Sequence, residues 1–229
     1  EWECICIDDG STDGSRAILE SISSRDPRFR ILSQPHAGAG TARNVALEEA
    51  VGEFLVFLDS DDIFSPWMFE TLLAEAEREN ADVVACREAL FVDGLPAPSF
   101  SKPPTPRLVD KTPDPDWSRD PLSVGTMPWN KIVRRQLFLD YGLRFQEQKS
   151  TNDLSCMALV LSLSKKTVCT DLKLVGYRQR KRSIQSAKDP ACWMSAIRCM
   201  TKRLQEIGAW GVLTDKGMGV FFVWFAKNA

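Results

Sequence analysis

The sequence has little of what several kinds of site require. Histidine occurs once, as His36, and the seven cysteines include no Cys-x-x-Cys pair, so an ordinary zinc site is hard to assemble. No apolar run approaches the roughly 20 residues of a membrane-spanning helix; the closest candidate is residues 220–226. The formal net charge is -2 with acids and bases interspersed. The chain therefore lacks a basic field for binding nucleic acid or an anionic membrane non-specifically.

The cysteines are expected to be small core residues with free thiols. Cys4 and Cys6 alternate along an expected strand, and the odd total of seven leaves at least one cysteine unpaired. Such a set suits the reduced cytoplasm. A length of 229 residues suits one α/β domain with an appendage.

The most informative stretch is the apolar run 54–58, which ends on Asp59, Asp61 and Asp62. An apolar run of this length between turn formers predicts a buried strand of a parallel sheet, with the acids just past its carboxyl end. Ligands bind at that edge of open α/β sheets, and carboxylates that repel one another favour a divalent cation. The alternative is an acidic loop before the next helix, whose start Ser65 and Pro66 would form.

Strands and helices are expected to alternate through the first part of the chain. The patterns predict strands at 3–7, 29–32, 54–58, 81–85 (continuing irregularly to 92), 167–169 and 174–177. They predict helices at 15–24, 41–51, 66–80, 134–141, 153–164 and 190–207. The alternation to about residue 86 predicts a doubly wound, mostly parallel sheet.

A proline-rich excursion interrupts this pattern. Residues 93–128 contain nine of the 13 prolines, which excludes regular helix or central strand over most of this length. The segment is predicted to be either a functional surface loop or a linker.

A second strand also ends on carboxylates, Asp8 and Asp9, and a glycine-rich loop at 34–40 opens a helix nearby. Together these features predict a pocket for a ligand with phosphate and hydroxyl groups, such as a sugar nucleotide.

Six short motifs, in order, resemble the signature series of family-2 glycosyltransferases with the GT-A fold. They are CIDDGSTDGS at 6–15, ARN at 42–44, FLDSDD at 57–62, PWNK at 128–131, ND at 152–153 and YRQRKRS at 177–183. The resemblance covers about residues 2–187. It implies a Rossmann-like, mostly parallel α/β sheet flanked by helices in a domain at 1–187, with a C-terminal helical extension at 188–229.

The resemblance also implies roles for the acids. Asp9 matches the family's acid that hydrogen-bonds the nucleotide base, usually uracil, and Asp8 lies beside it. Asp59 and Asp61 match the two acids of the DxD motif, of which the first contacts the ribose and the second binds the metal, Mn²⁺ or Mg²⁺, that bridges the diphosphate. Asp62 is placed to assist.

Asp153 matches the base of these inverting enzymes, which takes the proton from the acceptor hydroxyl. It is alternatively only an acid favoured by a helix dipole. Arg43 and Asn44 match a motif close to the nucleotide. Their alternatives are structural: Arg43 pairing with the acid cluster, and Asn44 satisfying loop backbone.

The remaining candidates concern the diphosphate and the acceptor. Arg178, Arg180 and Arg182 match a motif that clamps the diphosphate with bidentate hydrogen bonds, although a solvated basic strand end is the ordinary explanation of such a run. Trp129 is a candidate platform for a sugar ring, with burial in the core as the alternative.

The chain departs from the family pattern twice. Asn152 stands where the family usually has glutamate, and the apolar strand that lies centrally in the family's sheet has no counterpart in this sequence. Both departures favour a catalytically inactive module that binds a glycan or protein. The acids that match the family favour the enzyme; they are Asp9, Asp59, Asp61 and Asp153. A third hypothesis is a metal-dependent phosphohydrolase, because acids after a strand also serve that chemistry.

For partners, the resemblance implies a UDP-sugar donor and a glycan or lipid-linked sugar acceptor in surface polysaccharide synthesis, and no nucleic acid. The expected location is the cytoplasm. Peripheral association with the inner face of the membrane and a homo-oligomer are left open.

Overall fold

The computed structural model describes residues 1–100, 108–110, 124–180 and 189–209. Within these ranges the helices are α1 (Ser15–Ser23), α2 (Ala39–Glu49), α3 (Met68–Glu79), α4 (Arg135–Tyr141), α5 (Leu154–Leu163) and α6 (Pro190–Glu206). The strands are β1 (Cys4–Asp8), β2 (Phe29–Ser33), β3 (Phe54–Leu55), β4 (Ile63–Phe64), β5 (Val83–Val92), β6 (Leu108–Asp110), β7 (Lys131–Arg134) and β8 (Thr167–Gln179). All the predicted helices are present, and their ends agree with the predictions to within two residues.

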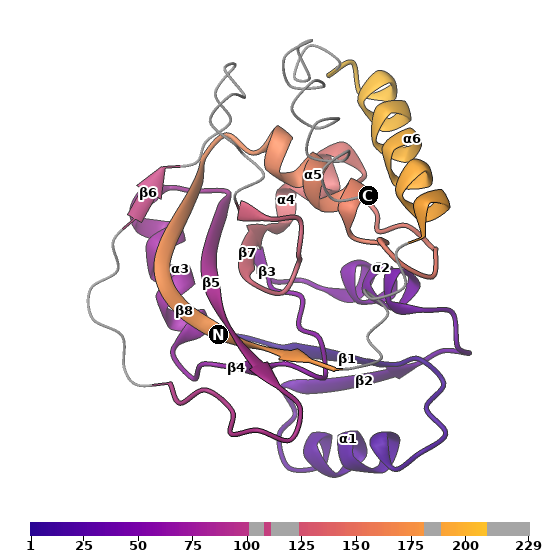
Figure 1. Ribbon diagram of the computed structural model, residues 1–229, viewed down its shortest axis with the longest axis vertical. Helices are drawn as coiled ribbons and strands as arrows, with labels where there is room; N and C mark the ends of the chain where they lie inside the picture. The colour runs from indigo at the N-terminus through magenta and orange to yellow at the C-terminus, as the bar shows by residue number, and fades with distance from the viewer. Residues whose placement is uncertain (101–107, 111–123, 181–188, 210–229) are drawn as a thin grey trace.

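The first two strands form a parallel pair of their own. β1 and β2 pair from Cys4 opposite Phe29 to Asp8 opposite Ser33, so both strands end at the same edge. Helix α1 packs on the outer side of this pair, as Figure 1 shows at the bottom of the view. The strand-loop-helix unit predicted from the sequence is confirmed here.

The larger sheet is mixed, which corrects the prediction of a mostly parallel one. Its order is β3-β7-β5-β8-β4, with β6 also paired to β8. β5 and β8 run parallel, whereas β7 is antiparallel to both β3 and β5, and β4 and β6 are antiparallel to β8. A buried apolar run shows that a strand is covered on both faces but not which way its neighbour runs, so the sequence pattern left these directions undetermined.

The strand predicted at 54–58 is shorter than expected, and its pairing is antiparallel where a parallel sheet was predicted. β3 covers only Phe54–Leu55 and pairs with β7, a strand that the sequence pattern did not reveal. Among the described residues, β1 pairs only with β2 and β3 only with β7. Among the described residues the two acid-bearing strand ends therefore belong to separate sheets.

β8 joins two predicted strands into one. The register against β5 shifts between Ala85 and Arg87 and again between Arg87 and Glu88, so β8 accommodates extra residues opposite β5. Such a bulge interrupts the alternation of buried and exposed side chains, which explains why the pattern suggested two short strands.

The core has two layers, one on each face of β5. Val83 and Ala85 face a cluster that contains residues of α2, α4, α5 and α6. Val84 and Cys86 face a second cluster, built on Met68, Leu72 and Ala76 of α3. Successive side chains of a strand point to opposite faces, so an uninterrupted apolar run buries both.

The C-terminal helix α6 shares the first of these layers. Ala196, Ile197, Met200 and Leu204 are buried in the same cluster as α5, and Figure 1 shows α6 lying alongside α5. Its start agrees with the sequence signal, because the Asp189 side chain accepts a hydrogen bond from the Ala191 amide and Pro190 occupies the first turn. In the described ranges no helix is long and apolar enough to cross a membrane. The apolar run 220–226 lies outside them.

Candidate active site

The acid turn at 59–62 follows β3, and Arg43 of α2 binds it. The Arg43 Nη2 donates to Asp59 Oδ1 at 2.5 Å, and the Arg43 Nη1 donates to Asn152 Oδ1 at 2.8 Å. The acid turn and the turn before α5 are thus joined through one guanidinium. The structural alternative for Arg43, pairing with the acid cluster, is confirmed, and it brings Asn152 into the same site.

The carboxylate of Asp62 is partly buried by the fold, and its pKa is shifted. Its Oδ1 accepts a hydrogen bond from the backbone amide of Arg178 at 2.9 Å, whereas its Oδ2 is buried without a partner among the described residues. Burial, reinforced by the charges of Asp61 and Asp59, raises the pKa of Asp62 to about 6. A buried carboxylate oxygen without a hydrogen bond is costly, and a cation would offset that cost.

The acid turn fits a cation that takes part of its coordination from a ligand. Within the described ranges no group of three or more histidine, cysteine, aspartate or glutamate side chains is arranged to hold a metal ion. Magnesium and manganese sites that bind substrate phosphates need only one or two carboxylates from the protein. Asp59, Asp61 and the unpartnered oxygen of Asp62 match that smaller requirement.

The basic residues at the carboxyl end of β8 contact the acid turn. The Arg178 Nε donates to the backbone oxygen of Asp61 at 2.8 Å, and its Nη1 donates to Asp93 Oδ1 at 3.0 Å. Arg180 lies farther out, with its Nε 3.8 Å from Asp61 Oδ2 and half of its side chain exposed. Of the predicted clamp, Arg180 has the more open guanidinium, and Arg182 lies outside the described residues.

Asp9 is occupied by the loop that opens α2. Its carboxylate accepts hydrogen bonds from Gln34 Nε2 at 2.6 Å and from the amides of Ala37 and Gly38 at 2.8 and 2.9 Å, and His36 Nδ1 lies 2.9 Å from it. Burial acts to raise the pKa of Asp9, but the bonds from Ala37 and Gln34 outweigh it and lower the pKa. A carboxylate has about four acceptor positions, so a nucleobase would have to displace a side chain such as that of His36.

Asp8 is buried beside Asp9 and organises the other side of this edge. Its Oδ1 accepts the Ser11 amide at 3.1 Å, and hydrogen bonds from the Ser11 side chain and amide lower the pKa of Asp8. Asp8 and Asp9 therefore both fix loops at the carboxyl ends of β1 and β2.

Asp153 is the residue immediately before α5, and its side chain makes no capping hydrogen bond. Burial raises the pKa of Asp153, and the charge of Asp59 acts in the same direction, while Arg43 and Lys131 act to lower it. The carboxylate is therefore not a hydrogen-bonding cap of α5. A raised pKa next to cationic partners is typical of a catalytic acid or base.

Asn44 is structural, as its alternative interpretation predicted. Its Nδ2 donates to the Phe145 carbonyl at 2.9 Å, and its Oδ1 accepts from the Phe145 amide at 2.8 Å. Gly40, one turn earlier in α2, lies so close to the same loop that an added Cβ would be 2.0 Å from the Gln146 oxygen. The amino half of α2 is thereby locked to the loop that leads to Asp153.

Trp129 belongs to the core, which corrects its assignment as a sugar platform. It is 3% exposed and stacks on Tyr177, with ring centroids 5.1 Å apart. The neighbouring Tyr177 is more exposed, and its pKa is raised by burial and by the acids at 62, 61 and 59. The motif at 177–183 predicted no separate role for Tyr177, yet the charges of the acid turn reach this side chain.

Sequence reasoning also missed Lys131. This side chain is fully buried, and its Nζ donates to the Met127 carbonyl and to Asn130 Oδ1. Burial lowers the pKa of Lys131 to about 8. No pattern in the sequence marked it, because β7 begins at Lys131, ends at Arg134 and is too short to show which side chains are buried.

No disulfide joins the seven cysteines, all of which lie among the described residues, but only some of them are core residues. Cys86 and Cys156 are buried, whereas Cys199 is exposed.

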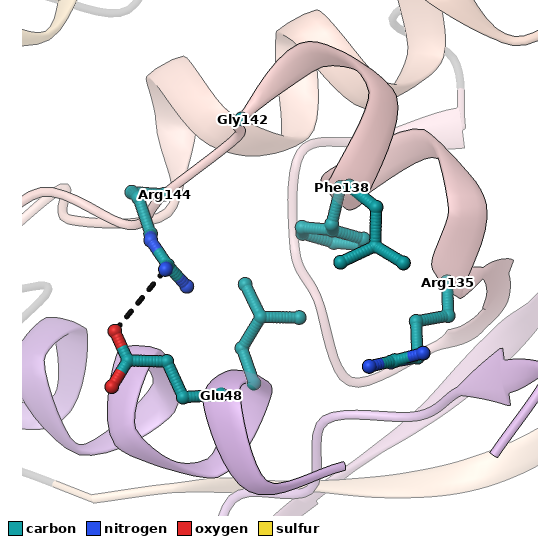
Figure 2. Close-up of a pocket in the computed structure, with 7 residues that line it drawn as sticks. Glu48, Arg135, Phe138, Gly142 and Arg144 are labelled. Atoms are coloured by element: carbon teal, nitrogen blue, oxygen red, sulfur yellow. Dashed lines mark ion pairs between the residues drawn. The ribbon is translucent and has the colours of Figure 1, made fainter. Parts of the chain in front are cut away.

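A pocket of about 290 Å³ lies away from these residues, at the carboxyl end of α2. Figure 2 shows Arg144 paired with Glu48 on one side of it and Arg135 on the other. The Arg135 Nε is buried and has no hydrogen-bond partner within the described ranges. None of the predicted site residues lines this pocket.

Comparison with known proteins gives consistent matches. The model of glycosyl transferase family 2 matches residues 1–142. A cholesterol galactosyltransferase from Borreliella burgdorferi is 31% identical over 173 residues, covering 71% of this chain and 48% of the relative. The uncharacterized glycosyltransferase YibD from Escherichia coli K12 is 34% identical over 148 residues, covering 62% and 43%. The chain thus spans about half the length of these curated relatives.

The fold is also similar to that of a solved structure. The crystal structure of S. aureus TarS 1–349 in complex with UDP-GlcNAc matches with a TM-score of 0.71 at 23% identity, covering 89% of this chain and 58% of that one. At this identity the match bears on the fold, and it agrees with the GT-A architecture expected from the motifs.

Proposed function

The chain is a member of glycosyl transferase family 2, and we propose that it forms the donor-binding and catalytic part of a metal-dependent, inverting transferase. The donor is a UDP-sugar, and the acceptor is a hydroxyl group of a glycan or lipid-linked sugar in surface polysaccharide synthesis. The observation that carries the proposal is Arg43, which binds Asp59 of the acid turn and Asn152, the neighbour of Asp153. One side chain thus joins the acids suited to the donor to the acid suited to the acceptor.

The acid turn is proposed to hold the diphosphate end of the donor. Asp59 would face the ribose and Asp61 would hold the cation, which would also offset the cost of the buried, unpartnered oxygen of Asp62. When bound, Mn²⁺ or Mg²⁺ supplies Lewis-acid stabilisation of the negative charge that develops on the departing nucleoside diphosphate. Arg180, half exposed beside Asp61, adds a positive charge at the same place.

Asp153 is proposed to take the proton from the attacking hydroxyl. Burial raises its pKa towards the working pH, which suits a general base, while Arg43 and Lys131 favour the ionised form that accepts the proton. Asp8 and Asp9 fix the loops on the nucleoside side of the site. The similar fold of TarS, which was crystallised in complex with UDP-GlcNAc, supports a UDP-sugar as the donor.

The proposal is tested by calorimetric titration of UDP-sugars with and without Mn²⁺, together with assays of transfer to acceptors. Donor binding should require Mn²⁺ in the parent chain and be lost in Asp61→Asn, whose melting temperature should stay unchanged. Asp153→Asn should bind donor as the parent does, yet transfer sugar about a hundredfold to ten-thousandfold more slowly.

Three outcomes would contradict parts of the proposal. Equal Mn²⁺-dependent affinity in Asp61→Asn would exclude the metal role of Asp61. Donor binding without transfer, in the parent and in Asp153→Asn alike, would favour the inactive binding module. Release of phosphate without any acceptor would favour the phosphohydrolase.

A further inference from the structure

Arg43 is held on two sides at once. Its two terminal nitrogens serve different partners, Asp59 at 2.5 Å and Asn152 at 2.8 Å, and its guanidinium carbon lies 5.5 Å from the centre of the Phe145 ring. Only 14% of the side chain is exposed. The planar fork of an arginine fixes the angle between two such acceptors, so moving either acceptor rotates the guanidinium away from the other.

The Asn152 end of this contact is fixed by the backbone. The Asn152 carbonyl accepts the Gln146 amide at 2.9 Å, and Asn152 Cβ would lie 3.1 Å from a Cβ added at Gly40. The preceding residue, Thr151, has a φ of 57°, a left-handed conformation that is unfavourable for a β-branched side chain. The turn is therefore held in a strained shape that presents the Asn152 carboxamide to Arg43.

We propose that Asn152 is a positioning residue that holds Arg43 against Asp59 and so makes the acid turn and the start of α5 one unit. This inference rests on the proposed function, because the unit it describes is the donor side and the acceptor side of the same site. Asn152 itself touches neither substrate.

The carboxamide suits this task because it is neutral. A carboxylate at this position would compete with Asp59 for the single positive charge of Arg43, and it would add a negative charge next to Asp153. The amide oxygen of Asn152 accepts a hydrogen bond that orients the Arg43 guanidinium, and because it carries no charge it does not compete with Asp59. The departure from the family pattern at this position is then compatible with an active site.

A double-mutant cycle tests the inference. Asn152→Ala should weaken donor binding about tenfold, the cost of losing one hydrogen bond to a charged group. Arg43→Met removes the fork, so adding Asn152→Ala to it should change donor affinity less than about twofold. Asn152→Asp keeps an acceptor oxygen at the same reach but competes with Asp59 for the charge of Arg43, so it should weaken donor binding by more than about threefold. Glu147→Ala, an exposed site in the same loop, is the matched control and should bind as the parent does.

Donor affinity is measured by titration calorimetry with a UDP-sugar and Mn²⁺, and folding of each variant by circular dichroism. If Asn152→Ala does not fold, Asn152→Gln replaces it, because the added methylene displaces the oxygen from Arg43 while keeping the amide. Additive effects of the two substitutions would overturn the positioning role, as would a parent-like affinity in Asn152→Ala. A parent chain that binds no nucleotide sugar would instead contradict the proposed function, and the positioning role with it.

Discussion

Removing the Asn44 side chain should unlock α2 from the loop that leads to Asp153. Asn44→Ala leaves the buried amide and carbonyl of Phe145 without their partners, which the native carboxamide binds at 2.8 and 2.9 Å. Each unsatisfied buried group costs about 1–3 kcal/mol, so the free energy of unfolding should fall by roughly 2–6 kcal/mol, towards the lower end if water enters the space. Urea unfolding followed by circular dichroism measures this change.

Asn44→Asp separates the two hydrogen bonds. The carboxylate still accepts the Phe145 amide, but its second oxygen faces the Phe145 carbonyl, so its folded pKa should be raised above the unfolded value of about 3.9. The ionised form is then disfavoured only in the folded state. Stability relative to the parent should be largely restored below the unfolded pKa and lost as the pH rises through the folded pKa. A loss of less than about 1 kcal/mol in the alanine variant, or a pH-independent aspartate variant, would refute this reasoning.

Two further predictions concern Gly40 and Lys131. Gly40→Ala places a Cβ 2.0 Å from the backbone oxygen of Gln146, so it should lower the free energy of unfolding, measured in urea, by about 1–3 kcal/mol. Gly14→Ala, whose Cβ would have nothing within 4 Å, is the control and should not lower it. Equal effects of the two substitutions would contradict the close approach at Gly40. The pKa of Lys131 is lowered to about 8, so between pH 8 and about 10.4 the unfolded chain binds a proton that the folded one does not. The stability of the parent relative to Lys131→Met should therefore rise by about 3 kcal/mol over that range, and parallel pH profiles would show that the pKa is not lowered.

Local pattern predicted local structure well in this chain. The sequence predicted α3 and α5 because the apolar residues of α3 recur at helical spacing and those of α5 fill whole turns. Such spacing places apolar side chains on one face of a helix, and that face is the one that is buried. β4, with two residues, and β7, with four, are too short to show a period.

The pairing of distant residues was beyond the same reasoning. Sequence position relates Arg43 to its acid turn through a motif, but nothing local relates it to Asn152, 109 residues away. Trp129 shows the converse. Its place in a motif suggested a ligand platform, whereas its stacking on Tyr177 and burial under α3 are decided by elements far along the chain. Motifs located the acids, and only the fold assigned their partners.

Because the strands form two separate sheets, the two sheets are expected to differ in their stability against local unfolding. β1 pairs only with β2 among the described residues, whereas β5 is flanked by β7 and β8 and covered on both faces. Amide protons of β1 and β2 can therefore exchange through a partial opening that leaves β5 and β8 intact. Asp8 and Asp9 belong to this less protected unit, while Asp153 adjoins the better protected one. A nucleotide that contacts both the β1–β2 pair and the larger sheet would stabilise the closed state, so its binding should suppress this partial opening.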